Sequence, residues 1–177
     1  MTNQDIATAM QRVATVLRRR PEAGLHDDAP AAARWAGGTR IVARHANGAE
    51  VTTDMPGELG GSGDQVTPGW LFRAGLAPCA ATCIAMAAAA AGIELSALEV
   101  MASSRSDTRG LLGMADADGA PVPAGPREVR LQVRIAAPGV ATERLRALVE
   151  AGCRYSPTPE AVRTATALDL RIDVDTA

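Results

Sequence analysis

Hydrophobic positions follow a helical period in some stretches of the chain and alternate with polar positions in others. The helical period predicts helices over residues 2–20, 67–92 and 141–152, and a short helix over 159–164. Alternation predicts strands over residues 34–45, 50–53, 95–105, 127–136 and 168–174. Because the strands come in pairs separated by two substantial helices, the sequence predicts an α+β fold.

Local signals place several boundaries between these elements. Pro21 ends the first helix directly after three arginines, which favour the negative end of the helix dipole. Asn47-Gly48 is typical of a two-residue hairpin turn between strands. We therefore divide the chain into an N-terminal helix and connector, residues 1–33, and one domain over residues 34–177.

The charge balance and the shortage of aromatic residues exclude one large class of functions. The 177 residues include 18 arginines, no lysine and 20 acidic residues, which gives a net charge of −2. This balance provides no broad cationic surface for the phosphates of a nucleic acid. The chain has only two Trp, one Tyr and one Phe, so a base-stacking surface is also excluded. We expect no nucleic-acid partner.

The sequence also bears on where the protein acts. Residues 2–20 are polar and amphipathic, without the apolar core of a signal peptide. The longest apolar run, residues 74–92, is mostly alanine, which gains little free energy on leaving water, and Pro78 interrupts it. We interpret this run as a buried helix rather than a membrane span, and expect no membrane partner. A cytoplasmic location is expected.

Three cysteines and two histidines are the residues from which a reactive or metal site would be built. Cys79, Cys83 and Cys153 are too few, and odd in number, for a disulfide scaffold. His26 and His45 are far in sequence from every cysteine, so the spacing of a metal site is missing. We predict no metal and no bound cofactor. In a reducing compartment such cysteines are more often chemical than structural.

The central helix places two of these cysteines on one face. Leu71, Gly75, Cys79, Cys83 and Met86 follow one another at spacings of four, four, four and three residues. One interpretation is a buried stripe, in which the free cysteines pack as small hydrophobic residues. The other is a reactive site, which requires a cation or a helix N-terminus that lowers the thiol pKa. The spacing alone leaves both interpretations open.

The residues that lead up to Cys79 form a pattern that is found in a known family. Pro68, Leu71, Ala74 and Cys79 lie at fixed spacings, and the glycine-rich loop ELGGSG (58–63) precedes them. This arrangement resembles the thiol peroxidase family of the osmotically inducible protein OsmC and the organic hydroperoxide resistance protein Ohr. The central helix of that family carries the pattern Asn-Pro-Glu-x-Leu-x-x-Ala-x-x-x-Cys.

A second motif strengthens the resemblance. Cys153 lies in AGCRYS (151–156), which is similar to the family's second-cysteine motif of Cys, Pro, a variable residue and Ser. The resemblance runs over about residues 34–174, with the two motifs in the same order and at a comparable separation. It implies an OsmC-like fold, in which antiparallel β-sheets wrap around long central helices in an intertwined homodimer, with the active site at the interface.

The resemblance also implies a reaction. Cys79 would be the peroxidatic thiol, whose thiolate attacks the distal oxygen of an organic hydroperoxide and releases the alcohol. The sulfenic acid left on Cys79 would condense with Cys153, the resolving thiol, to form a disulfide. An external dithiol, in this family usually a lipoyl group on a protein, would then reduce the disulfide. The implied role is defence against oxidative stress.

Further site residues follow from the same resemblance. The family's activating arginine lies in an early glycine-rich strand or hairpin, for which Arg44 is the candidate here, with Arg40 and Arg73 as alternatives. Trp70 and Phe72 lie where the family lines the apolar pocket for the alkyl part of the peroxide. For each of these two aromatic residues, packing in the dimer interface is the alternative.

One departure from the family pattern leaves a second function open. Gly69 replaces the glutamate that pairs with the activating arginine, although Glu58 or Asp64 of the preceding loop could take its place. Without that tether, the alternative is an OsmC-fold dimer that binds a small apolar or thiol ligand and has lost efficient peroxidase activity.

Another departure concerns the resolving thiol. Arg154 replaces the family's proline, and the helix before Cys153 is about one turn shorter than usual, which moves Cys153 along the axis by roughly 5 Å. Cys83 is therefore an alternative partner of Cys79. Two thiols four residues apart on a helix form a disulfide poorly, because both side chains point toward the N-terminus. We interpret Cys83 as a packing residue.

Overall fold

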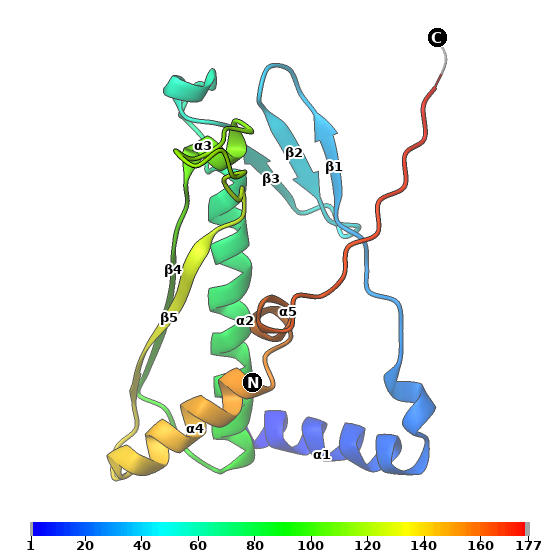
Figure 1. Ribbon diagram of the computed structural model, residues 1–177. Helices are drawn as coiled ribbons and strands as arrows, with labels where there is room; N and C mark the ends of the chain where they lie inside the picture. Colours follow the sequence, from blue (N-terminus) through cyan, green and yellow to red (C-terminus); the bar gives the residue numbers. More distant parts are fainter. Residues whose placement is uncertain (1, 176–177) are drawn as a thin grey trace.

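The computed structural model describes residues 2–175, which form helices and antiparallel strands along a central helix (Figure 1). The helices are α1 (Asn3–Arg19), α2 (Pro68–Ala90), α3 (Thr108–Leu111), α4 (Thr142–Arg154) and α5 (Pro157–Arg163), with the 3₁₀ turns η1 (Pro21–Gly24) and η2 (Gly57–Leu59). The strands are β1 (Ala32–Trp35), β2 (Ile41–Arg44), β3 (Glu50–Thr53), β4 (Ala97–Arg105) and β5 (Arg127–Ala136). The predicted α+β class is confirmed, and a helix lies at each place where the sequence predicts one.

The strands form two separate antiparallel sheets. β1, β2 and β3 follow one another in a three-stranded meander, and β4 pairs with β5 in a long two-stranded ribbon. The prediction of one strand over 34–45 is wrong, because the chain turns back between Trp35 and Ile41, which face each other across β1 and β2. Gly37 and Gly38 permit this turn, since their φ angles of +107° and +54° lie in the left-handed region.

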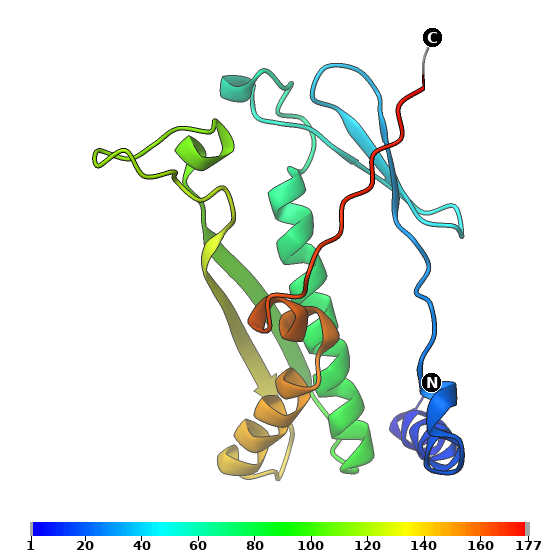
Figure 2. The same cartoon turned by 45° about the vertical axis from the view of Figure 1, so that its right-hand side comes forward.

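α2 is the axis on which several other elements pack (Figure 2). The β4–β5 ribbon, α4, α5 and the start of α1 all contact it. Its most buried row consists of Leu76, Ala80, Ile84 and Ala88, which recur every four residues. Small alanines alternate with larger side chains in this row, so neighbouring elements approach the helix closely.

The interpretation of the cysteine-bearing face as a buried stripe is wrong. Cys79 and Cys83 are half-buried, whereas Gly75 and Met86 on the same face are exposed. This face lies next to the buried row of α2 and is turned toward α5 and α1. The cysteines therefore border the core instead of filling it, and both sulfur atoms have polar neighbours.

α1 is attached to the fold at its N-terminal end. Thr2 and Asp5 form a reciprocal capping box, and the Nδ2 of Asn3 donates to the carbonyl oxygen of Ile93 at 3.0 Å. From there α1 runs away from α2 (Figure 1), and Val13 on its apolar side is 57% exposed. One chain therefore covers only part of the apolar stripe of α1.

α2 is also less enclosed than the sequence predicts. By length and composition the helix could cross a membrane, since its most apolar 18-residue stretch has a mean hydropathy of 1.5. Of that stretch, 22% is buried within the chain. The sequence predicts a buried helix, and one chain alone buries it only in part. Its contacts with β4, α4, α5 and α1 show that it serves as the packing axis of this fold.

The last predicted strand, over residues 168–174, is not formed. The segment is extended (Figure 2), but it has no strand partner within residues 2–175. Its apolar side chains are all exposed, at 94% for Leu168, 76% for Leu170, 75% for Ile172 and 80% for Val174. The segment has the alternating apolar and polar residues of a strand, but within residues 2–175 no strand pairs with it.

Candidate active site

Cys79 lies in the middle of α2, under the turn that joins α4 to α5. This turn follows Cys153 directly, and α5 packs on α2 at this level (Figure 1). Gly75, one helical turn before Cys79, lies beside Thr158, since a Cβ atom at position 75 would be in ordinary van der Waals contact with Thr158 Cγ2 at 3.9 Å. The fold therefore brings the segment after the second cysteine onto the first cysteine.

Two groups of this turn donate hydrogen bonds to the sulfur of Cys79. The hydroxyl of Ser156 donates at 3.2 Å and the backbone N–H of Thr158 donates at 3.4 Å. Ser156 is fully buried and precedes the first turn of α5, but its side chain makes no capping hydrogen bond to that helix. The Ser156 hydroxyl points at the Cys79 sulfur instead. The N–H of Thr158 points there too, since an N–H in the first turn of α5 has no partner inside that helix.

These contacts favour the thiolate form of Cys79. Partial burial raises the pKa of the Cys79 thiol, but the hydrogen bonds from Ser156 and Thr158 stabilise the negative sulfur and outweigh it. The neighbouring Cys83 side chain acts in the same direction. The pKa of Cys79 is thereby lowered from the ordinary value of a cysteine, which is the condition for a nucleophilic thiol.

The other two cysteines lie close to the same junction of α2, α4 and α5. The thiol of Cys83, one turn further along α2, donates to the carbonyl oxygen of Tyr155 at 3.8 Å. Burial raises the pKa of Cys153, Cys83 raises it further, and Arg163 opposes this rise. All three cysteines are free in the structure. The disulfide between Cys79 and Cys153 stays a prediction.

The candidate arginines are engaged elsewhere in the chain. Arg44 lies opposite Glu50 in the β2–β3 pairing, with 3.5 Å between its Nε and the Glu50 Oε1. Arg73 donates to the hydroxyl of Ser104 at 3.3 Å. Within the described part of the chain, the hydrogen bonds to Cys79 come from Ser156 and Thr158 rather than from an arginine. The assignment of Arg44 as the activating arginine stays a prediction.

Arg40 holds the loop that leads into α2. Its Nη2 lies 3.2 Å from Asp54 Oδ2 and 2.5 Å from Asp64 Oδ1. Asp54 is only 4% exposed and accepts hydrogen bonds from the hydroxyls of Thr39 and Ser62, each at 2.6 Å. These hydrogen bonds, that of Ser62 first, hold the pKa of Asp54 well below its usual range. Asp64 therefore pairs with Arg40. That Asp64 takes the place of the family's glutamate stays a prediction.

The comparison with known families agrees with this arrangement. The OsmC-like protein family matches residues 61–171, which is more than half of the chain and includes all three cysteines. The chain belongs to the OsmC-like family. The resemblance inferred from the motifs around Cys79 and Cys153 is thereby confirmed. Among curated proteins, no match to this sequence was found.

Solved structures of OsmC-like proteins share the fold. An organic hydroperoxide resistance protein from Legionella pneumophila is 22% identical, with a TM-score of 0.58 over 78% of this chain and 91% of its own. An OsmC-like protein from Mycoplasma pneumoniae is 17% identical, with a TM-score of 0.64 over 78% of this chain and 89% of its own. An organic hydroperoxide resistance protein from Elizabethkingia anophelis is 21% identical, with a TM-score of 0.57 over 78% and 90%.

The two aromatic residues near the start of α2 lie differently with respect to Cys79. Phe72 precedes Cys79 by seven residues, close to two helical turns, so it lies on nearly the same side of α2 about 10 Å away along the axis. Trp70 precedes Cys79 by nine residues, which places it on the opposite side of the helix, and it is 47% exposed. A substrate-binding role stays a prediction for both residues.

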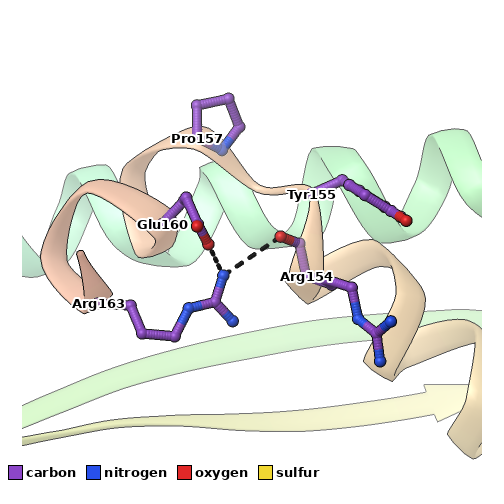
Figure 3. Close-up of a pocket in the computed structure, with 5 residues that line it drawn as sticks. All are labelled: Arg154, Tyr155, Pro157, Glu160 and Arg163. Carbon is purple, nitrogen blue, oxygen red and sulfur yellow. Dashed lines mark hydrogen bonds and ion pairs between the residues drawn. The ribbon is translucent and has the colours of Figure 1, made fainter.

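A recess of about 440 Å³ borders the end of α4 that carries Cys153 (Figure 3). Its lining comes from Arg154, Tyr155, Pro157, Glu160 and Arg163. Arg163 reaches across it, pairs with Glu160 and donates to the Arg154 carbonyl oxygen at 3.3 Å. Among the described residues, no group of three or more His, Cys, Asp or Glu side chains could hold a metal ion.

Sequence reasoning missed a donor at Cys79 and a charge cluster in the loop before α2. Ser156 is part of the second-cysteine motif, so the motif gave its position but not its role as a donor to Cys79. The cluster of Arg40 with Asp54 and Asp64 spans residues that lie far apart in sequence. Only the folding of the loop 54–64 back onto β2 brings these side chains together.

Proposed function

We propose that this OsmC-like protein is a thiol-dependent peroxidase that reduces organic hydroperoxides and serves in oxidative stress defence. The observation that carries the proposal is the pair of hydrogen bonds from Ser156 and Thr158 to the Cys79 sulfur. Both donors come from the turn that follows Cys153. The names of the structurally similar proteins, which refer to organic hydroperoxide resistance, support the same substrate class.

In the first step Cys79 is the nucleophile. Its thiolate attacks the distal oxygen of the hydroperoxide, an S–O bond forms and the O–O bond breaks. The electron pair of that bond leaves with the alkoxide, which takes a proton from water and departs as the alcohol. Cys79 is oxidised to the sulfenic acid. Before this step, the hydrogen bonds from Ser156 and Thr158 favour the thiolate of Cys79, which is the reactive form.

In the second step Cys153 acts as the resolving thiol. Condensation of the Cys79 sulfenic acid with a thiol forms a disulfide and releases water, which protects Cys79 from oxidation to the sulfinic acid. An external dithiol of the lipoyl type, free or carried on a protein, then reduces the disulfide by thiol–disulfide exchange. In this proposal the protein needs no bound cofactor, and it works in the reducing cytoplasm.

We also propose that the working form is a homodimer. One chain leaves part of the apolar helix α2 exposed, and within residues 2–175 the apolar row Leu168, Leu170, Ile172 and Val174 has no neighbouring strand. Exposed apolar surface of this extent is typical of an interface between chains. In such a dimer Phe72 and Trp70 would line the approach of the alkyl group to Cys79, and Arg44 would be the additional cation.

The proposal is tested by steady-state consumption of cumene hydroperoxide with dihydrolipoamide as the reductant. We expect turnover by the wild-type protein and none by Cys79→Ser, because the serine hydroxyl is not ionised at neutral pH. Met86→Leu, on the same face of α2 but without contact to the sulfur of Cys79, serves as the control and should retain activity. Equal rates for wild type and Cys79→Ser would contradict the proposal.

One observation favours a second function. Gly69 occupies the place of the family's glutamate, and a Cβ atom at position 69 would lie 3.9 Å from both Arg73 Nη1 and Thr67 Oγ1. A member without the glutamate–arginine pair is suited to bind a small apolar or thiol ligand without turnover. In that case Cys79 would stay a free thiol after one equivalent of hydroperoxide is added to the protein.

A further inference from the structure

Cys83 is a nucleophilic side chain that the proposed mechanism does not use. It is half-buried, lies one turn after Cys79 on the same face of α2, and contacts the turn after Cys153 through its hydrogen bond to the Tyr155 carbonyl oxygen at 3.8 Å. From the sequence alone, Cys83 is interpreted as a packing residue. The structure instead places it beside both other cysteines.

The crossing of α2 and α4 brings Cys83 and Cys153 together. At the crossing, Gly152 lies against Ile84 so closely that a Cβ atom on residue 152 would be 2.8 Å from the Ile84 Cα. Each helix carries a cysteine directly beside this contact, at position 83 on α2 and at position 153 on α4. Residues beside such a contact lie on backbones that approach closely, as a disulfide requires, since it spans a Cα–Cα distance of roughly 4.4–6.8 Å.

Cys79 lies further from this crossing. Four residues separate it from Cys83, which is about 6 Å along the helix axis. Its sulfur is held by Ser156 and Thr158, beyond the end of α4. The charges around Cys153 agree with this arrangement. Burial raises the pKa of Cys153 and Cys83 raises it further, whereas Cys79 does not contribute to this shift.

We infer that Cys83 is the thiol that pairs with Cys153 and that it carries the oxidation from Cys79 to Cys153. The inference rests on the proposed peroxidase function for the source of the oxidation, whereas the pairing of Cys83 with Cys153 stands on the helix crossing alone.

The transfer proceeds in two balanced steps. The Cys83 sulfur attacks the sulfur of the Cys79 sulfenic acid, an S–S bond forms, and the hydroxyl group leaves as water with the Cys83 proton. The Cys153 thiolate then attacks the Cys83 sulfur, forms the Cys83–Cys153 disulfide and returns the electron pair to Cys79. The proton of Cys153 passes to water.

The structure favours this direction of transfer. A disulfide between residues four apart on a helix has poor geometry and exchanges readily. Of its two sulfur atoms, that of Cys79 is the better leaving group, because Ser156 and Thr158 stabilise its thiolate. The final disulfide then joins two helices across their contact and leaves Cys79 reduced.

The test is peptide mapping of the intact protein after one equivalent of cumene hydroperoxide and alkylation of the remaining thiols. Cleavage at arginine leaves Cys79 and Cys83 together in the peptide 74–105, so fragment ions must show which of the two carries the alkyl group. We expect Cys83 linked to Cys153, with Cys79 alkylated. A Cys79–Cys153 disulfide in the wild-type protein would overturn the inference.

Variants separate the two steps. Cys153→Ser should accumulate the Cys79–Cys83 disulfide. Cys83→Ser, and Cys83→Ala as a second form, should slow disulfide formation at Cys153 at least about tenfold, and Cys79 should then reach the sulfinic acid. Met86→Leu, one turn further along the same face, should behave as the wild type. Unchanged disulfide formation at Cys153 in both Cys83 variants would overturn the relay.

A second oxidant distinguishes failure of this inference from failure of the proposed function. Diamide oxidises thiol pairs directly, so the pairing can be tested in Cys79→Ser without any peroxidase step. We expect Cys83–Cys153 to form there as well. If hydroperoxide leaves all cysteines reduced but diamide forms this disulfide, the peroxidase proposal fails and the pairing stands. If diamide gives no such disulfide, the pairing is wrong.

Discussion

Cys79 owes its reactivity in this account to one hydroxyl and one backbone N–H. Ser156 precedes α5, where a serine usually caps the helix, but here its hydroxyl donates to sulfur. The serine is fully buried, so water does not compete for this hydrogen bond.

Replacing Ser156 tests this role. Ser156→Ala removes one hydrogen bond to the thiolate, which contributes roughly 1 kcal/mol, so the Cys79 pKa should rise and alkylation at neutral pH should slow about fivefold. α5 should lose little stability, because the serine side chain does not cap it. Rates of iodoacetamide labelling against pH measure the shift.

Two comparisons control that experiment. Ser106→Ala removes an exposed hydroxyl on another part of the chain and should leave the labelling rate unchanged. Arg44→Ala should have a smaller effect than Ser156→Ala, since Arg44 pairs with Glu50 in the chain. A large loss of Cys79 reactivity in Arg44→Ala with none in Ser156→Ala would assign the activation to the arginine.

The pH dependence of labelling separates the cysteines. The pKa of Cys79 is lowered and that of Cys153 is raised, and only thiolates react with iodoacetamide. At neutral pH Cys79 should therefore be labelled before Cys153. As the pH rises through the pKa of Cys153, its thiolate fraction increases and the difference should shrink. Labelling of Cys153 first at neutral pH would contradict these shifts.

At this scale the sequence identified the candidate cysteines but not the groups that contact them. Cys79 and Cys153 were identifiable because their motifs are local. The hydrogen bond from Ser156 to Cys79 joins residues 77 positions apart, and the cluster around Asp54 depends on how one loop folds. Such contacts are fixed by tertiary packing, which a local pattern does not encode.

At the scale of elements, the contact of α2 with α4 positions the three thiols. Gly152 is required there, because any side chain at this position would meet the backbone of Ile84. The glycine thus controls how closely Cys153 approaches α2.

Gly152→Ala tests the requirement for close approach. The added Cβ would be 2.8 Å from the Ile84 Cα, so we expect the free energy of unfolding to fall by about 1–3 kcal/mol, despite the higher helix propensity of alanine. Urea denaturation measures the change. Gly125→Ala, where nothing lies within 4 Å of the added Cβ, is the control and should be nearly neutral.

The elements themselves were largely predictable. The helical period and the stop signals located α1, α2 and α4, and strict alternation located β4 and β5. The errors have physical causes. Gly37 and Gly38 turn the chain within an apparently continuous strand, and the segment 168–174 has a strand pattern but no neighbour to pair with in one chain.

For the whole molecule, one chain leaves apolar surface without a cover. α2 is exposed on much of its surface, and the apolar row of residues 168–174 projects into solvent. A second copy would provide both a neighbour for the row and a cover for α2, which agrees with the proposed homodimer. The extent of this surface was not predictable from the sequence, since the same apolar pattern would serve a fully buried helix.

A pair of charge substitutions tests the dimer. Leu170→Asp places a carboxylate in the apolar row, whereas Arg171→Asp introduces the same side chain on the opposite face of the extended segment. We expect the wild type and Arg171→Asp to be dimers and Leu170→Asp to dissociate. Light scattering during size-exclusion chromatography measures the mass. A wild-type protein with the mass of one chain would contradict the dimer.

The central claim is that Cys79 is an activated peroxidatic thiolate, and trapping of its sulfenic acid tests this most directly. The variant with both Cys83→Ser and Cys153→Ser retains Cys79 alone, so the sulfenic acid has no thiol to condense with in its own chain. After one equivalent of cumene hydroperoxide in the presence of dimedone, we expect one dimedone adduct on Cys79 and one equivalent of alcohol per chain. An unmodified Cys79, with the hydroperoxide intact, would contradict the account.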